Sequence, residues 1–222
     1  MNFKPSDFFI SLVEFFAILL PGFIVAFLFK NDILLIFPAE TVSFSTGSVS
    51  AAAYYFIASY IIGHFVFGAS GFILEALRPF RTYFARRWEV DKAVKIMHDK
   101  LVSIEGEGNA SREKKTHKKE ILWLQKWADS VIQIKHPELI ITIRQYEADA
   151  KFFRSFVVVS LIGLVHSLII SDKNFPFWYW IISGIISISL HFYWKFEAIK
   201  DASNVLVTMD SLGEFKLKTP EV

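Results

Sequence analysis

The chain contains no cysteine. Disulfide-stabilised scaffolds, Cys-ligated zinc, iron–sulfur clusters and thiol catalysis are therefore excluded. Charged residues make up only 21% of the sequence and the formal net charge is +2, so the total charge does not indicate nucleic-acid binding. The six histidines show no metal-ligand spacing, and no GxGxxG, P-loop or G-x-S-x-G motif occurs. The sequence therefore predicts no catalytic residue, no metal and no cofactor.

Large apolar side chains are in excess instead. Of 222 residues, 53% are hydrophobic and 17% are aromatic, with 24 Phe, whereas a soluble domain has about 45–50% apolar residues. A bilayer-spanning helix needs about 20 mostly apolar residues, and four segments qualify. They cover roughly residues 8–29, 49–74, 152–170 and 177–194. The first is too long for a signal peptide and no small-residue cleavage site follows it, so we expect an uncleaved anchor.

The orientation of these spans follows from the basic residues between them. The segment 78–154 carries 17 basic and 11 acidic residues, whereas the other two loops contribute Lys30 and Lys173 alone. Basic loops stay on the cytoplasmic side, so we expect both termini to be cytoplasmic in a multi-pass protein of the bacterial inner membrane. The expected parts are spans one and two with a short external loop (1–77), a cytoplasmic helical hairpin (78–151), spans three and four (152–195) and a cytoplasmic tail (196–222).

The hairpin is predicted from helical spacing of apolar residues. Glycines near residue 106 separate two helices, and Pro137 begins a third that leads into the third span. The first helix has an apolar seam of Val90, Val94, Met97, Leu101 and Ile104, and the second one of Leu124, Trp127, Val131 and Ile134. Packing within one chain is favoured, with a coiled coil between copies as the alternative. The expected fold is an all-α integral membrane protein with four transmembrane helices, and the tail is expected to fray.

Ionisable residues inside the predicted spans are the main candidates for function. Such residues are costly in hydrocarbon and mark functional sites by default, although a neutral histidine can also simply join two helices. Counted along the helices, Glu14, His64 and His191 lie in the inner half of the bilayer and His166 in the outer half. The sequence predicts an intramembrane polar cluster of the inner three, with His64 as the partner of Glu14.

Small residues and a proline mark two further features of the spans. Pro21 and Gly22 predict a kink in the first span, which is either a hinge or static. Gly63, Gly68 and Gly71 in the second span predict close helix packing, within one chain or between copies.

Two basic motifs lie in the cytoplasmic segment. Four arginines follow the second span among aromatic residues, namely Arg78, Arg81, Arg86 and Arg87. Basic residues at this position suit anionic lipid headgroups. Their role in setting the orientation of the span is sufficient to explain their presence. Arg112 and His117 form an R-x4-H spacing that resembles the ribonuclease motif of HEPN domains. Glu113 departs from that motif, and a solvated lysine-rich helix face explains the spacing better. Nucleic acid is not an expected partner.

Two short motifs in the first two spans carry a resemblance. They are Leu19-Leu20-Pro21-Gly22 and Tyr60-Ile61-Ile62-Gly63-His64. The pair resembles a pattern in small bacterial inner-membrane proteins found beside antiviral defence genes. That resemblance implies a membrane sensor or a membrane-perturbing effector.

The function expected from these features is that of a homo-oligomeric membrane protein. It would sense or perturb the bilayer by forming a pore or depolarising it, in antiphage defence or a stress response, with the segment 78–151 binding a cytoplasmic protein partner. The alternative is an ion or proton channel or transporter that uses the intramembrane Glu and His. A membrane enzyme and a structural scaffold are the remaining classes, and no motif supports either.

Overall fold

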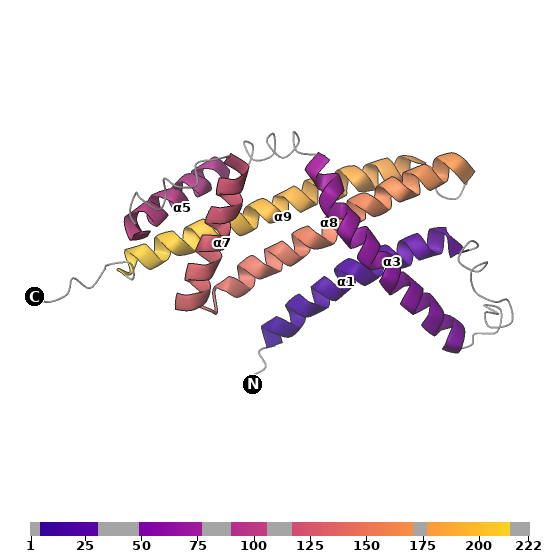
Figure 1. Ribbon diagram of the computed structural model, residues 1–222, viewed down its shortest axis with the longest axis horizontal. Coiled ribbons are helices and arrows are strands. Elements are labelled where there is room, and N and C mark those ends of the chain that lie inside the picture. The colour runs from indigo at the N-terminus through magenta and orange to yellow at the C-terminus, as the bar shows by residue number, and fades with distance from the viewer. Residues whose placement is uncertain (1–4, 31–48, 77–89, 106–116, 171–176, 214–222) are drawn as a thin grey trace, which may run out of the picture. The chain divides into compact units, whose positions relative to one another are not determined.

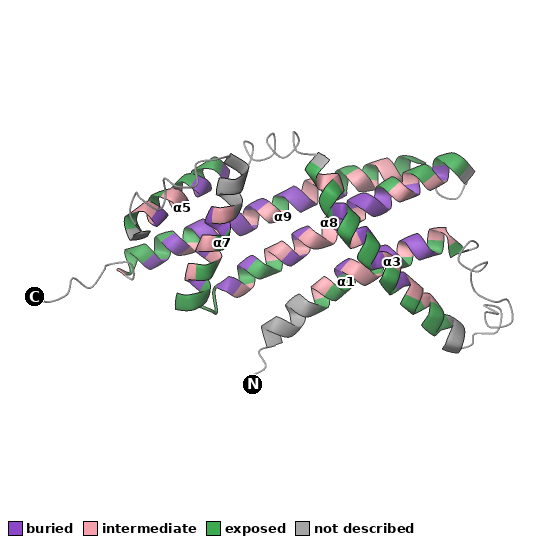
Figure 2. Ribbon diagram, viewed as in Figure 1, coloured by how far each residue is buried: buried purple, intermediate pink, exposed green. Residues whose placement is uncertain are grey.

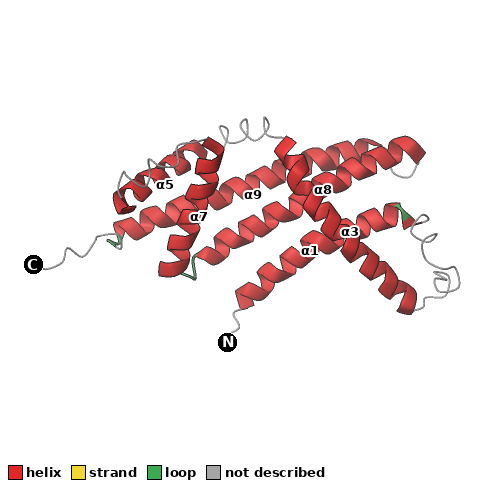
Figure 3. Cartoon of the chain, in the orientation of Figure 1, coloured by secondary structure: helices red, strands yellow, loops and turns green. Residues whose placement is uncertain are grey.

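A computed structural model describes residues 5–30, 49–76, 90–105, 117–170 and 177–213 of the chain. In these ranges the protein consists of six helices without any strand, as Figure 3 shows. The helices are α1 (Pro5–Leu28), α3 (Val49–Ala76), α5 (Val90–Glu105), α7 (His117–Lys135), α8 (Ile140–Ile170) and α9 (Phe177–Ser211). The predicted all-α class is confirmed.

The chain divides into two compact units. Unit 1 comprises Met1–Arg78 and Ala148–Tyr193, and unit 2 comprises Pro79–Glu147 and Trp194–Val222. Helices α8 and α9 each contribute residues to both units, and their course can be followed by colour in Figure 1. The residues after Trp194 therefore group with the predicted cytoplasmic hairpin rather than forming a separate tail.

Among the described residues, two helices are long and apolar enough to cross a membrane. They are Ala52–Glu75 in α3 and Ile140–Ile169 in α8. Only 22% and 33% of the residues in their most apolar windows are buried, whereas a core helix of a soluble protein would be mostly covered. Leu12–Leu28 forms a shorter apolar helix. The segment 177–194 is less apolar, because it has Trp and Tyr residues at both ends and contains His191. Two of the four predicted spans therefore meet the criterion of length and hydropathy.

Unit 1 exposes many large apolar side chains and buries several small polar ones, beside an apolar cluster of Val25, Val66, Val158 and Val159. Its exposed surface is rich in Phe, Ile and Leu, and Phe72 and Phe65 are 84% and 76% exposed. Its buried positions include six serines and a histidine, namely Ser59, Ser70, Ser155, Ser160, Ser167, Ser187 and His191. The exposed face of α3 is visible in green in Figure 2.

Unit 2 has an apolar core between helices, and fewer large apolar side chains are exposed on its described residues than on those of unit 1. The seam predicted for α5 is confirmed at Val90, Val94, Met97 and Leu101, which are all buried; the side chain of Ile104 lies outside the described residues. The first turns of α8 add Ile140 and Ile143 to the buried set. An apolar stripe at a helical period therefore drives the association of these elements.

The predicted face of α7 is confirmed at Leu124, is half-buried at Trp127 and Val131, and is contradicted at Ile134. Leu124, Ala128 and Ile132 are fully buried, whereas Ile134 is 82% exposed. The prediction followed the large apolar residues and was wrong for Ile134. Ala128 lies one helical turn from both Leu124 and Ile132 and is fully buried with them.

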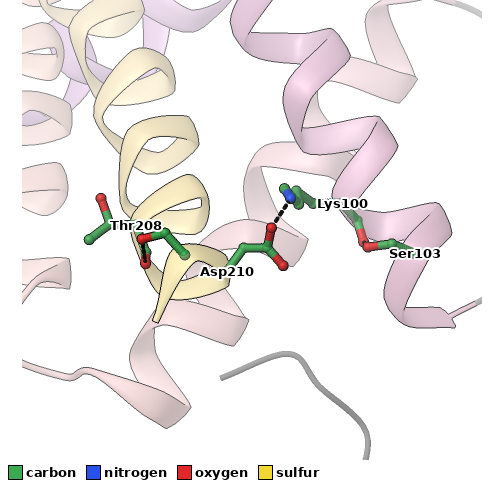
Figure 4. A network of polar contacts seen from close by, with 5 residues as sticks. Lys100, Ser103, Thr208 and Asp210 are labelled. Carbon is green, nitrogen blue, oxygen red and sulfur yellow. Dashed lines mark hydrogen bonds and ion pairs between the residues drawn. The ribbon is translucent and has the colours of Figure 1, made fainter. Parts of the chain in front are cut away.

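Helix α9 continues well beyond the predicted span. Residues Ala198, Ile199, Ala202, Leu206 and Met209 are buried, so the segment expected to fray is helical as far as Ser211. Near its end Asp210 forms an ion pair with Lys100 of α5, drawn in Figure 4. Gly213, with φ 76°, supplies the left-handed residue that ends the helix.

Candidate functional site

Helices α1 and α3 cross at two glycines. A Cβ on Gly22 would lie 1.8 Å from the carbonyl oxygen of Ser59, and one on Gly63 would lie 2.1 Å from that of Ile18. Pro21 is also fully buried here. The predicted hinge residues and Gly63 thus lie in one close backbone contact, where no larger side chain fits.

The other two glycines of α3 lie in a different environment. A Cβ on Gly68 or Gly71 would meet no atom within 4 Å, and both residues are exposed. His64 lies on the same exposed side of α3, with its ring edge-on to Tyr60 at a centroid distance of 4.6 Å. The structure therefore divides the three glycines between a filled crossing and an open face.

Glu14 of α1 pairs with a lysine rather than with the predicted His64. Lys151 Nζ of α8 lies 2.7 Å from Glu14 Oε1, and the two side chains are 40% and 46% exposed. The sequence reading placed Lys151 at the end of the cytoplasmic segment and so did not consider it. The sequence feature that could have indicated this ion pair is the position of Lys151, a basic residue directly before the third apolar run.

His191 is 6% exposed and points at the same turn of α8. Its Nδ1 lies 2.8 Å from the carbonyl oxygen of Ala150, so this nitrogen donates the hydrogen bond. Ala150 precedes Lys151, and α8 thereby holds Glu14 and His191 through consecutive residues. His166 lies elsewhere, edge-on to Phe29 at 5.2 Å.

Polar and small residues also join α8 to α9 within unit 1, which sequence reasoning missed. Ser160 Oγ donates to Ser183 Oγ at 3.1 Å. A Cβ on Gly163 would lie 2.3 Å from the ring of Trp180, so only glycine accommodates this indole. Serines spaced along an apolar run were the signal for such contacts.

Arg154 of α8 is a second residue that sequence reasoning missed. Its guanidinium lies over the ring of Phe67 of α3, 4.7 Å from the ring centroid. Its Nε is buried and has no hydrogen-bond partner. A single basic residue two positions inside the predicted third span was the signal for it.

Unit 2 contains a buried carboxylate. Oδ1 of Asp129 is buried without a hydrogen-bond partner. Burial and the nearby Glu147 carboxylate raise the pKa of Asp129 from 3.8 to about 7, against a smaller opposing effect of Arg144. Glu147 itself accepts a hydrogen bond from Gln125 Nε2 at 2.8 Å. Nothing in the sequence distinguishes Asp129 from the other acidic residues of this segment.

Several predicted residues lie outside the described part of the chain. They are the four arginines Arg78, Arg81, Arg86 and Arg87, together with Arg112 and the side chain of His117. Within the described ranges no group of three or more His, Asp or Glu residues is arranged to hold a metal ion.

No protein-family model matches this chain, and neither curated proteins nor solved structures give a match. Its function must therefore be argued from the distribution of polar and apolar side chains in unit 1 and from the few charged groups placed there.

Proposed function

We propose that this chain is a bacterial inner-membrane protein that spans the bilayer four times, assembles with copies of itself and senses or perturbs the membrane. The observation that carries the proposal is the surface of unit 1, on which many phenylalanines and isoleucines are exposed while six serines and a histidine are buried. Lipid tails are as apolar as leucine, so helices in a bilayer associate through small and polar residues.

The same pattern extends the membrane assignment from α3 and α8 to α1 and α9. Helix α1 buries Ala17 and Ala26 while Phe23 and Phe27 are each 47% exposed. On the first half of α9, Ser187 is buried while Ile185 is 60% exposed. Lipid is the environment in which exposed apolar surface of this extent is stable, which supports four spans.

Self-association is supported by the open face of α3. Exposed residues recur there at steps of four and three, namely Ile57, Ile61, His64, Gly68, Gly71 and Glu75. Phe65 and Phe72 project beside the two open glycines. Large rings next to uncovered backbone form a surface that can pack against an identical one. Such packing would also remove His64 from lipid, where an ionisable side chain is costly.

Unit 2 supports the coupling role. It buries an apolar core, and one of its two chain segments is the basic segment that the charge rule predicts to be cytoplasmic. Helices α8 and α9 run from unit 1 into unit 2 without interruption. We propose that a cytoplasmic protein partner binds unit 2 and acts on the membrane helices through these two connections. The resemblance of the LLPG and YIIGH motifs favours a role in antiphage defence or stress.

The first test is the oligomeric state of the full chain in lipid nanodiscs, measured by mass photometry. We expect an oligomer for the wild type and a shift to smaller particles for Gly68→Leu and Gly71→Leu. Leu161→Ala, a change at an exposed position of α8, is the control and should leave the size unchanged. A wild-type monomer would refute self-association. Expression in cells with a potential-sensitive dye then tests depolarisation.

A second candidate function is an ion or proton path, favoured by one observation: His64 lies uncovered on the proposed association face. In an oligomer this histidine would lie between copies or line a pore. Proton and cation flux into liposomes distinguishes the two functions. His64→Ala should abolish flux if the residue lines the path, and should leave any membrane perturbation intact if it only packs.

A further inference from the structure

Arg154 is a positive charge in unit 1 whose only described contact is an aromatic ring. Phe67 holds the guanidinium from α3 at 4.7 Å. Its Nε is buried and has no hydrogen-bond partner. Within the described residues no carboxylate forms an ion pair with Arg154.

The carboxylate of Glu14, which reaches this part of α8 from α1, is already paired with another base. Lys151 lies one helical turn before Arg154, and its ammonium is bound to Glu14 at 2.7 Å. That pair is neutral as a whole, so the charge of Arg154 remains uncompensated. A cation–π contact compensates only part of the cost of taking the buried side of this half-buried guanidinium out of water. An anion is the missing component.

The chemistry of the group indicates which anion fits. A guanidinium presents five donors in a planar fork that matches the oxygens of a phosphate. Arg154 lies at the cytoplasmic start of the predicted third span, at the depth where lipid phosphates meet the hydrocarbon. We propose that Arg154, held against Phe67, binds the phosphate of an anionic lipid headgroup. This inference rests on the proposed membrane placement of unit 1.

The test measures lipid binding to the purified full chain by native mass spectrometry, with thermal stability in detergent as a second readout. Phosphatidylglycerol should bind the wild type and raise its Tm, while phosphatidylcholine and inorganic phosphate should not. Arg154→Gln should weaken phosphatidylglycerol binding at least tenfold, and Arg154→Lys should retain part of it. Arg144→Gln, the same change at an exposed arginine of unit 2, is the matched control and should bind as the wild type does.

Three results would overturn the inference. Unchanged phosphatidylglycerol binding in Arg154→Gln would remove the site. Equal stabilisation by inorganic phosphate, lost in Arg154→Gln, would assign the site to a free anion instead of a lipid. An equal loss of phosphatidylglycerol binding in Arg144→Gln would show that the net charge of the protein, and not a site at Arg154, governs binding. Carbonate extraction of membranes separates this inference from the proposed function: release of the chain refutes membrane insertion, whereas retention with unchanged lipid binding refutes the lipid site alone.

Discussion

Gly22 of α1 and Gly63 of α3 lie in direct backbone contact: a Cβ built on Gly22 would be 2.6 Å from the amide nitrogen of Gly63 and 2.8 Å from its Cα. Figure 1 shows the two helices crossing. Two residues far apart in sequence, each without a side chain, thus determine how closely the first two helices approach.

The first prediction concerns this crossing. Gly22→Ala and Gly63→Ala should each destabilise the helix pair by about 2 kcal/mol or more, because the added methyl overlaps backbone atoms that cannot move independently. Gly68→Ala is the matched control on the same helix, where a Cβ meets nothing, and it should be neutral. The midpoint of detergent-induced unfolding measures the effect. Equal midpoints for Gly22→Ala and Gly68→Ala would contradict the observed crossing.

The second prediction uses two isoleucines one half-turn apart on α7. Ile132→Asp should prevent unit 2 from folding, since it places a carboxylate at a fully buried position and costs more than about 3 kcal/mol. Ile134→Asp should change stability by less than about 0.5 kcal/mol, because this side chain is 82% exposed. Limited proteolysis of the full chain reads out cleavage within α7. Rapid cleavage in both variants would mean that Ile134 is also buried, as the sequence predicted.

The third prediction addresses the ion pair between α1 and α8. Glu14→Lys and Lys151→Glu should each lower stability, because each puts two like charges at a position where the wild type has an ion pair of 2.7 Å. The double variant restores opposite charges and should recover most of the loss. The coupling should be about 1 kcal/mol, as for pairs that stay partly exposed. A thermal-stability double-mutant cycle measures it. Strictly additive losses would mean that the two residues do not interact.

The fourth prediction is a pH dependence of unit 2. The pKa of Asp129 is raised to about 7 in the folded chain, so the protonated form favours folding and this stabilisation is lost as pH rises from about 4 to about 7. Asp129→Asn keeps an uncharged group at all pH values. Its Tm should therefore exceed that of the wild type by a margin that grows between pH 5 and pH 8.

Asp129 is partly exposed, so water screens its charge and the effect should be about 1–2 kcal/mol. This is well below the free energy that the pKa shift would represent for a fully buried group. Differential scanning fluorimetry of the full chain at both pH values measures it. Asp91→Asn, at an exposed position of α5, is the control and should show a constant difference from the wild type. A margin for Asp129→Asn that does not change with pH would mean that this carboxyl titrates at its ordinary pKa.

Much of the helical architecture was predictable because it depends on local spacing. The seam of α5 follows from apolar residues at steps of four and three, and its buried members are those that the spacing selects. The course of α8 from residue 140 into an apolar run is likewise local, since nothing in the run interrupts the helix. Predictions that needed a neighbour were less successful. Ile134 is exposed, and the predicted tail is helical from residue 196 to Ser211, because neighbouring helices, absent from any local pattern, select the buried face.

The partners of the candidate site depended on tertiary structure for the same reason. The sequence indicated that Glu14 and His191 were unusual, since ionisable groups are rare in apolar runs. It could not assign Lys151 to Glu14 or Ala150 to His191, because residues so distant meet only through the packing of α1 and α9 against α8. Arg154 and Asp129 were not distinguished at all. Their environments arise from burial, which is a property of the assembled helices.

The sequence by itself thus determined the helical class, the apolar character of the segments that form unit 1 and the candidate polar residues, because composition and periodicity are local properties. The tertiary structure alone decided which glycines pack and which remain open, which face of α7 is buried, and which charges are paired. Each of these depends on the distance between atoms far apart in the chain, and the close approach of α1 and α3 at Gly22 and Gly63 exists only once both helices have formed and met.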